Sequence, residues 1–276
     1  MAYIALGGVL KTEFGGVQRL YNFYYEASQY HNEELYIDFK NLLFLDGNLC
    51  ALFQSILYRL NKHNKLVFTT DFDFIKNKFD VLIRNGFIPL PNENGDNRNS
   101  TICLKQFDVA KPDEFIEYIQ NDLMSHRGLN LSEEETEKIL YCFVEIFSNI
   151  ELHSKTDEPF FACGQYFPEN GVLKFSIVDI GNGFLPAISA KTNQEINTAY
   201  DSIIWALKEK NTTKLNAPGG LGLTDLRDYF NQNNGQMQII TGDAFWSTEF
   251  DKTTIKYQNF PKQCCGTMIN LLFSYN

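Results

Sequence analysis

Three short segments in the second half of the chain most constrain how this chain can fold. They are Glu145-Ile-Phe-Ser-Asn149, Asp179-Ile-Gly-Asn-Gly183 and Gly219-Gly-Leu-Gly-Leu223, and a Gly266-Thr267 pair follows them. The local pattern places the first on a helix, the second at the end of a strand and the third in a loop before a helix. Short glycine patterns arise by chance, but segments in this order and in these settings reinforce one another. We therefore expect them to converge on one site.

The first segment lies on a long predicted helix. Ser132, with Glu135 three residues later, forms a capping box, so we expect a helix from about 133 to 154. Glu145 and Asn149 are four residues apart and therefore share a face of this helix. We expect further helices at 112–126, 195–210 and 222–233, and strands at 160–167, 172–179, 236–241 and 267–273.

The first half alternates between apolar strands and amphipathic helices. Strands are predicted at 35–39 and 66–70, with helices at 49–60 and 74–85, the second ended by Gly86. This order favours a largely parallel sheet. Turn-forming residues at 89–100 predict an exposed loop, and 101–107 a returning strand. The predicted fold class is α/β, with domains at 1–107 and 108–276.

A carboxylate directly after a buried strand is a candidate for binding a base. The strand at 175–179 ends in Asp179, whose oxygens can accept a hydrogen bond from the exocyclic amine of adenine. Gly181 and Gly183 let the backbone turn and approach a flat ligand closely. Taken alone, the same residues are equally typical of a simple turn after a strand.

The glycine-rich segment is a candidate for binding phosphate. Gly219, Gly220, Leu221, Gly222 and Leu223 precede a predicted helix, so free amides and the positive helix end can hold phosphate oxygens. The segment lacks the Gly-Lys-Ser/Thr ending of a P-loop. An isolated glycine cluster of this kind is more often a flexible loop.

Asn149 and Glu145 on the predicted helix are candidates for binding a metal ion and for accepting a proton. Asn149 offers a neutral oxygen to Mg²⁺, which shares its octahedral oxygen ligands with phosphates and water. Glu145, one turn earlier, can deprotonate an attacking water or hydroxyl group. The alternative is a polar helix face in solvent, but the dense apolar stripe beside it favours a face next to other elements.

Together these residues resemble the GHKL ATPase superfamily, which includes gyrase B, MutL and histidine kinases, and most closely its anti-sigma kinases. The resemblance covers about residues 130 to 275. It implies ATP and Mg²⁺ as ligands and a mixed sheet covered on one face by helices. It assigns the catalytic base and magnesium ligand to Glu145 and Asn149, the adenine-reading box to Asp179, Gly181 and Gly183, the phosphate loop to Gly219, Gly220 and Gly222, and support of an adenine-bound water to Thr267.

The same resemblance makes the segment 184–218 a mobile lid over the nucleotide. Lys214 and its basic, hydroxyl-bearing neighbours can then meet the terminal phosphates when the lid closes. A charged, solvated helix end is the alternative for these residues.

Residues 35–88 more weakly resemble a STAS domain, the fold of anti-sigma-factor antagonists. That family has a phosphorylatable Ser or Thr after the aspartate that corresponds to Asp46, whereas this chain has Gly47 and Asn48 there. The resemblance therefore implies a docking module rather than a phosphoserine switch. A generic α/β domain is the alternative.

Charge and hydropathy exclude several classes of partner. A net charge of -10 and a pI near 4.9 argue against binding to nucleic acid or to an anionic membrane surface. No stretch approaches the roughly 18 apolar residues of a membrane span, and the first residues lack the basic region of a signal peptide. We expect a cytoplasmic protein.

Three functions fit these expectations. The leading one is a regulatory protein that binds Mg·ATP and hydrolyses it slowly, with lid closure changing its contacts with the first domain, a protein partner or a second copy. The first alternative is a serine/threonine protein kinase like the anti-sigma kinases, in which Glu145 activates a substrate hydroxyl. The second is a sensor that binds ATP or ADP without turnover.

Overall fold

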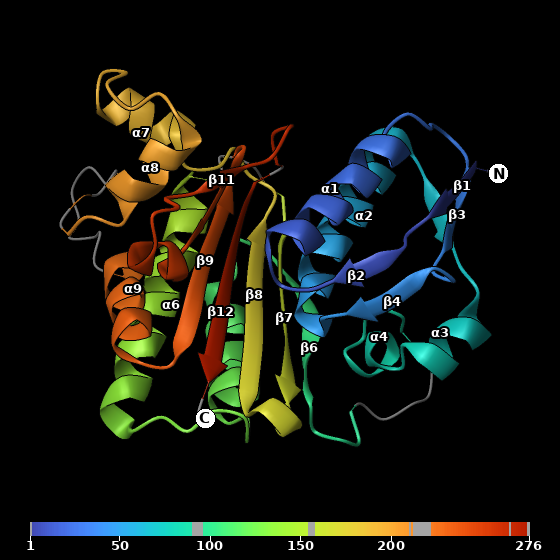
Figure 1. Cartoon of the computed structure of the whole chain (residues 1–276), viewed down its shortest axis with the longest axis horizontal. Helices are drawn as coiled ribbons and strands as arrows, with labels where there is room; N and C mark the ends of the chain where they lie inside the picture. Colours follow the sequence, from blue (N-terminus) through green and yellow to red (C-terminus); the bar gives the residue numbers. More distant parts are fainter. Residues whose placement is uncertain are drawn as a thin grey trace.

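The protein is a mixed α/β protein in which two different kinds of sheet follow one another along the chain. The computed structural model describes residues 2–89, 96–153, 158–209, 211, 222–264 and 266–274. An N-terminal part with small parallel sheets and helices precedes a seven-stranded antiparallel sheet packed against helices (Figure 1). The predicted α/β class is confirmed at this level.

Parallel strand pairs organise the N-terminal part. β1 (Ala2–Ala5), β3 (Glu34–Asp38) and β5 (Val67–Thr69) pair in that order, and β2 (Gly8–Leu10) pairs with β4 (Leu42–Leu45). Helices α1 (Phe14–Ala27) and α2 (Cys50–Asn64) pack beside them. The predicted order of strand, helix and strand is confirmed for β3, α2 and β5, whereas β1, β2, β4 and α1 were not predicted.

The predicted single helix at 74–85 is wrong. The chain forms two short helices there, α3 (Phe72–Lys78) and α4 (Val81–Arg84). Asp71 caps the first by accepting a hydrogen bond from the Phe74 N–H, and Phe79 leaves the helical conformation at its end. Asp80 lies at the break and pairs with Arg84 and Arg98.

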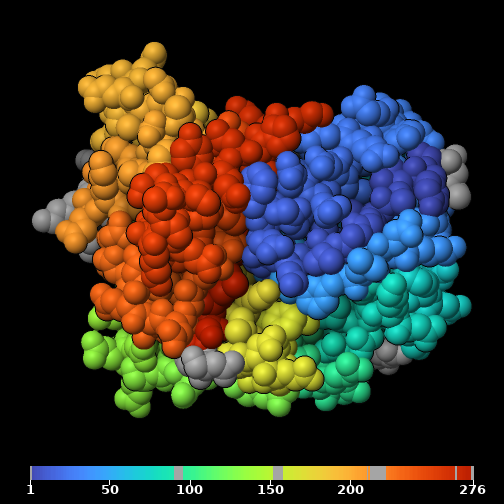
Figure 2. All heavy atoms as spheres, viewed as in Figure 1, coloured from blue at the N-terminus to red at the C-terminus, as the bar shows by residue number. Residues whose placement is uncertain are grey.

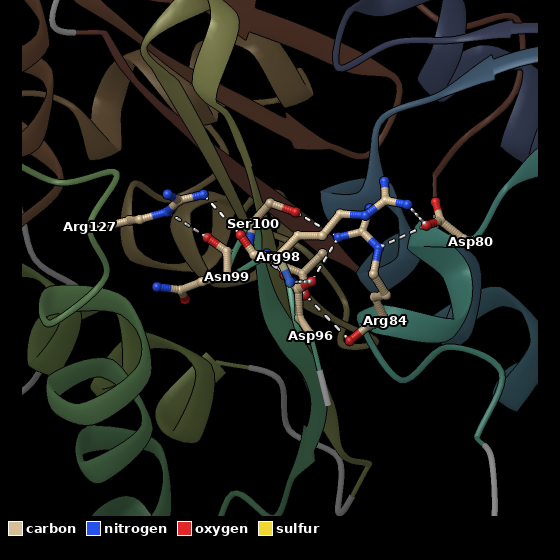
Figure 3. Close-up of polar contacts among 8 residues, drawn as sticks. Asp80, Arg84, Asp96, Arg98, Asn99, Ser100 and Arg127 are labelled. Carbon is tan, nitrogen blue, oxygen red and sulfur yellow. Dashed lines mark hydrogen bonds and ion pairs between the residues drawn. The ribbon is translucent and has the colours of Figure 1, made fainter. Parts of the chain in front are cut away.

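Asp96 organises the turn before β6 (Thr101–Phe107), as Figure 3 shows. Its carboxylate accepts hydrogen bonds from Arg84 Nη1 at 2.9 Å and from the backbone N–H groups of Ser100 and Thr101. Burial opposes ionisation, but the Arg84 guanidinium and the N–H groups outweigh it and lower the pKa of Asp96 to about 2. Residues 97–99 are exposed, as predicted for this loop, and 90–95 lie outside the described residues.

The second half forms one sheet in the order β11-β10-β9-β12-β8-β7-β6. Strands predicted from the apolar pattern agree closely with β7 (Phe160–Phe167), β8 (Val172–Asp179), β9 (Gly235–Thr241) and β12 (Thr267–Ser274). Two further strands, β10 (Ala244–Ser247) and β11 (Gln258–Asn259), were not predicted. Every described pair in this sheet is antiparallel, so the mixed sheet implied by the resemblance is wrong for these strands.

β6 belongs to this second sheet. It pairs antiparallel with β7, from Thr101 opposite Gln165 to Phe107 opposite Phe160. The predicted strand at 101–107 is therefore confirmed, and it forms the edge of the sheet that follows it in sequence. The division of the chain between 107 and 108 stays a prediction.

Helices cover one face of this sheet (Figure 1). They are α5 (Pro112–Tyr118) with its π-helical continuation Ile119–Met124, α6 (Glu133–His153), α8 (Ala199–Ala206) and α9 (Gly222–Gln232). The capping box is confirmed, because the Ser132 N–H donates to Glu135 Oε2 at 2.8 Å and the Glu135 N–H donates to Ser132 Oγ at 3.2 Å. Within the described residues no helix is long and apolar enough to cross a membrane.

The N-terminal part covers the opposite face of the same sheet. One hydrophobic core combines Leu20 of α1 and Phe53 of α2 with Val178 and Met268 of the sheet. Figure 2 shows the blue N-terminal residues lying directly against the red residues near the end of the chain. The sheet is therefore buried on both faces, which agrees with the apolar character of its central strands.

A closed ring of buried hydrogen bonds lies within this contact. Asn48 Nδ2 donates to Ser176 Oγ at 2.7 Å, and Ser176 donates to Asn270 Oδ1 at 2.6 Å. Asn270 Nδ2 donates to Gln238 Oε1, and Gln238 Nε2 donates to the Thr12 carbonyl, both at 3.0 Å. The Thr12 hydroxyl closes the ring at 3.0 Å from Asn48 Oδ1, and no member is more than 5% exposed. Such paired polar groups specify how two apolar surfaces meet.

Candidate functional site

One pocket of about 890 Å³, including its open mouth, lies between the ends of β8 and β12 and the helices that cover this face. α7 (Leu185–Lys191) and the end of α8 border it on a further side. Its lining residues are Glu145, Ile146, Asn149 and Ile150 from α6, Ile177, Asp179 and Gly183 from β8 and its turn, Phe184, Ala187 and Ile188 at α7, Trp205, Ala206 and Asn211 at α8, Gly222 and Leu223 from α9, and Thr267 and Ile269 from β12.

Asp179 and Thr267 mark one end of the pocket. They lie opposite each other in the β8–β12 pair, and both are buried. The Gly181 N–H donates to Asp179 Oδ1 at 2.7 Å. Burial raises the pKa of Asp179 to about 6, although hydrogen bonds from Gly181 and Thr267 lower it. The result is a desolvated carboxylate that a ligand donor can reach.

Two glycines allow the backbone to close around this end. Gly266 has a φ of +75°, and a Cβ there would overlap the carbonyl oxygen of Asp179. Gly183 has a φ of +72°, and a Cβ there would overlap Thr241 Oγ1, which accepts the Phe184 N–H at 3.2 Å. Both positions favour glycine because the left-handed region and the close approach exclude other side chains.

Glu145 and Asn149 lie near the start of α9. Both line the pocket, as expected from their shared face on α6, and Glu145 is only 8% exposed. A Cβ on Gly222, the first residue of α9, would lie 2.5 Å from the Cβ of Glu145. Because Gly222 has no side chain, α6 and α9 can approach each other where the positive end of α9 opens onto the pocket.

Most predicted site residues that the structure describes line this pocket. Glu145, Asn149, Asp179, Gly183, Gly222, Leu223 and Thr267 do so. Gly181 does not line it, but its N–H holds the Asp179 carboxylate. Lys214, Gly219, Gly220 and Leu221 lie outside the described residues.

The segment predicted as a lid contributes described structure to the pocket. α7 was not predicted, and α8 is shorter than the helix expected at 195–210. Phe184, Ile188 and Trp205 from this segment line the pocket beside the strand ends. Lid motion itself stays a prediction.

Several lining residues were missed from the sequence. Ile146 and Ile150 belong to the buried stripe of α6 and were assigned to the core. A usable signal existed for Ile177 and Ile269, because alternate residues of a strand share a face, here with Asp179 and Thr267. No local pattern marks Trp205 or Asn211.

Comparisons of the chain with models of protein families, with curated proteins and with solved structures find no match. The function is therefore argued from the pocket itself.

Proposed function

We propose that the second half of this chain is a GHKL-type domain that binds Mg·ATP and slowly hydrolyses it. The observation that supports this is the convergence of α6, the end of β8, the start of α9 and the start of β12 on one pocket. These are the elements that carry the four segments of the resemblance. One such segment can arise by chance, but chance does not explain why all four segments lie around a single cavity.

The end of the pocket at Asp179 and Thr267, which we call the base end, has the chemistry to bind adenine. Asp179 provides a buried acceptor, and apolar side chains of Ile150, Ile177 and Ile188 line the same pocket. A flat purine packs against such walls while its exocyclic amine donates to the carboxylate. Guanine presents a carbonyl oxygen at that position, and two acceptors would then face each other. We therefore expect ATP and ADP to be preferred over GTP.

The phosphate end lies at the start of α9. The positive end of the dipole of α9, which opens onto the pocket at Gly222, favours anionic oxygens. Among the described residues no cluster of three or more acidic, His or Cys side chains is suited to a closed metal site. Mg²⁺ would be held by the oxygen of Asn149, which lines the pocket, together with phosphate oxygens and water, which is the usual way this ion is bound beside a nucleotide.

Glu145 is the proposed base for turnover. Its carboxylate lies in the pocket beside the start of α9. It accepts a proton from water as the water oxygen bonds to the terminal phosphorus and the bond to the bridging oxygen breaks, giving ADP and phosphate.

The first half is proposed to be a STAS-like docking module. Asn48, which stands at the place of the phosphorylatable residue in that family, is fully buried and bonded to Ser176. A phosphate group there would separate the two halves of the protein. Phosphorylation at this place of the first half is therefore not supported, and phosphate transfer to a hydroxyl of a separate protein is the alternative to hydrolysis.

Calorimetric titration with ATP, ADP and GTP, with and without Mg²⁺, tests the binding site. We expect ATP and ADP to bind at least about tenfold more tightly than GTP. Absence of ATP binding by the folded protein, or equal binding of GTP, would refute the proposal.

Phosphate release separates turnover from binding. Glu145→Ala is expected to keep ATP affinity within about threefold and to remove hydrolysis, because the base contributes to the chemical step. Glu137→Ala, an exposed glutamate on the same helix, is the matched control and should behave like the parent. If Glu145→Ala releases phosphate as fast as the parent, Glu145 is not the base.

A further inference from the structure

α8 gives the pocket an aromatic wall that none of the four nucleotide segments provides. Trp205 and Ala206 end this helix and line the pocket, and Asn211, which also lines it, donates from Nδ2 to the Trp205 carbonyl at 2.9 Å. The other tryptophan of the chain, Trp246 on β10, is 1% exposed and packs in the core under the helices. Trp205 is therefore a tryptophan placed beside a cavity rather than in a core.

α8 is anchored at both of its ends. Near its start, Tyr200 stacks on Tyr257 with ring centroids 4.1 Å apart and an angle of 16° between the planes. At its end, the Leu207 carbonyl accepts hydrogen bonds from Thr224 Oγ1 at 3.2 Å and Arg227 Nη1 at 2.9 Å. The last carbonyls of a helix have no partner within it, so these donors hold the end of α8 in place.

Both donors come from α9, the helix that opens onto the pocket at Gly222. Thr224 is 1% exposed, and Arg227 is oriented by Asp228 Oδ1, which accepts from Nε at 2.9 Å and from Nη2 at 2.7 Å. The Leu207 carbonyl therefore ties the end of α8 to the first two turns of α9. The start of α8 lies at the strand ends, because a Cβ on Gly242, just after β9, would lie 2.8 Å from the Cβ of Ala199. Trp205, near the other end of α8, therefore lies toward the α9 side of the pocket.

On the basis of the proposed function, we propose that Trp205 contacts the sugar–phosphate part of the bound nucleotide, and that Thr224 and Arg227 position it through the Leu207 carbonyl. The face of the indole packs on the sugar, and its N–H is a donor for a phosphate oxygen. Trp205→Ala removes this contact and should weaken ADP binding about tenfold.

Tryptophan fluorescence can detect this contact directly, because the chain has only two tryptophans. The Trp246→Phe variant leaves Trp205 as the sole tryptophan. Adding ADP should shift the emission of Trp205, and the dissociation constant from this titration should equal that from calorimetry. The reciprocal variant, Trp205→Phe, should show no shift. If Trp246→Phe does not fold, the difference between the emission of the parent and that of Trp205→Phe gives the same readout.

Two outcomes would overturn the inference and are distinguishable. If calorimetry shows ADP binding but the emission of Trp205 is unchanged and Trp205→Ala binds as tightly as the parent, the role of Trp205 is wrong and the ATP site stands. If the parent binds neither ADP nor ATP, both proposals fail.

The positioning role is tested without nucleotide. With Trp205 as sole emitter, Thr224→Val and Arg227→Met should shift its emission to longer wavelength and increase quenching by iodide, because the indole is released toward solvent. Thr224→Ser and Arg227→Lys keep a donor and are the matched controls. Unchanged emission and quenching in folded Thr224→Val and Arg227→Met would show that these residues do not position Trp205.

Discussion

Replacing Asp179 by asparagine should stabilise the nucleotide-free protein and weaken ATP binding at the proposed adenine site. Burial raises the pKa of this carboxyl group from 3.8 to about 6. At about 1.4 kcal/mol for each pKa unit, ionised Asp179 lowers the free energy of unfolding by about 3 kcal/mol at neutral pH relative to its protonated form. An asparagine side chain cannot ionise, and its oxygen can still accept the Gly181 N–H.

The direction of this change of stability with pH follows from proton binding. Between 3.8 and about 6 the folded protein holds a proton on Asp179 that the unfolded chain has released. The contribution of this group to stability is therefore fully present below 3.8 and is lost as the pH rises through about 6. The Asp179→Asn substitution would remove this loss, so the advantage of the variant over the parent should grow with pH across that window.

Urea unfolding of parent and variant at several pH values measures this difference. The difference in unfolding free energy should change by about 2 kcal/mol in favour of the variant between about pH 4.5 and about pH 7.5. Any pH-independent effect of the amide, such as an unpaired donor, cancels in this comparison. A difference that stays flat across the window would show that Asp179 is not desolvated as the structure implies.

In parallel, ATP affinity should fall at least about tenfold, because the amide also presents a donor to the adenine amine.

Three further substitutions test other parts of the structure. Asn149→Ala should make ATP affinity less dependent on Mg²⁺ in calorimetry, and an unchanged Mg²⁺ dependence would argue against a metal ligand here. Gly222→Ala should lower the unfolding free energy by about 1–3 kcal/mol and slow phosphate release, because its Cβ would press on Glu145. Gly15→Ala, where a Cβ meets nothing within 4 Å, is its control. Asn48→Ala should cost about 1–3 kcal/mol in urea unfolding by leaving its buried partners unpaired, and a smaller loss would mean that water replaces the amide.

The long central strands of the second sheet were predictable because both of their faces are buried. β12 is apolar at every position from Met268 to Phe273 except Asn270, and such runs stand out from their surroundings. β1, β2 and β10 have only three or four residues each, so each places at most two side chains on a face. α1 begins with adjacent glycines, Gly15 and Gly16, which oppose helix formation locally, and packing on the sheet overrides this.

The polar end of the pocket was predictable, and its aromatic wall was not. Asp179, Glu145 and Asn149 belong to local patterns whose chemistry can be read from a few consecutive residues. The position of Trp205 depends instead on a carbonyl at Leu207 and donors on another helix. Such contacts join residues that share no sequence period, and only the folded structure brings them together.

The two halves of the protein meet directly behind the strand ends that carry Asp179 and Thr267. Ile180, the residue after Asp179, is 7% exposed and lies among residues of α1 and α2. Just before the neighbouring strand β12, Cys264 packs in the same core, and the Tyr25 hydroxyl of α1 donates to the Gln263 carbonyl. Both strand ends that carry the base site are thus supported from behind by N-terminal helices. The first half is therefore expected to contribute to the stability of the pocket wall at which the adenine site is proposed.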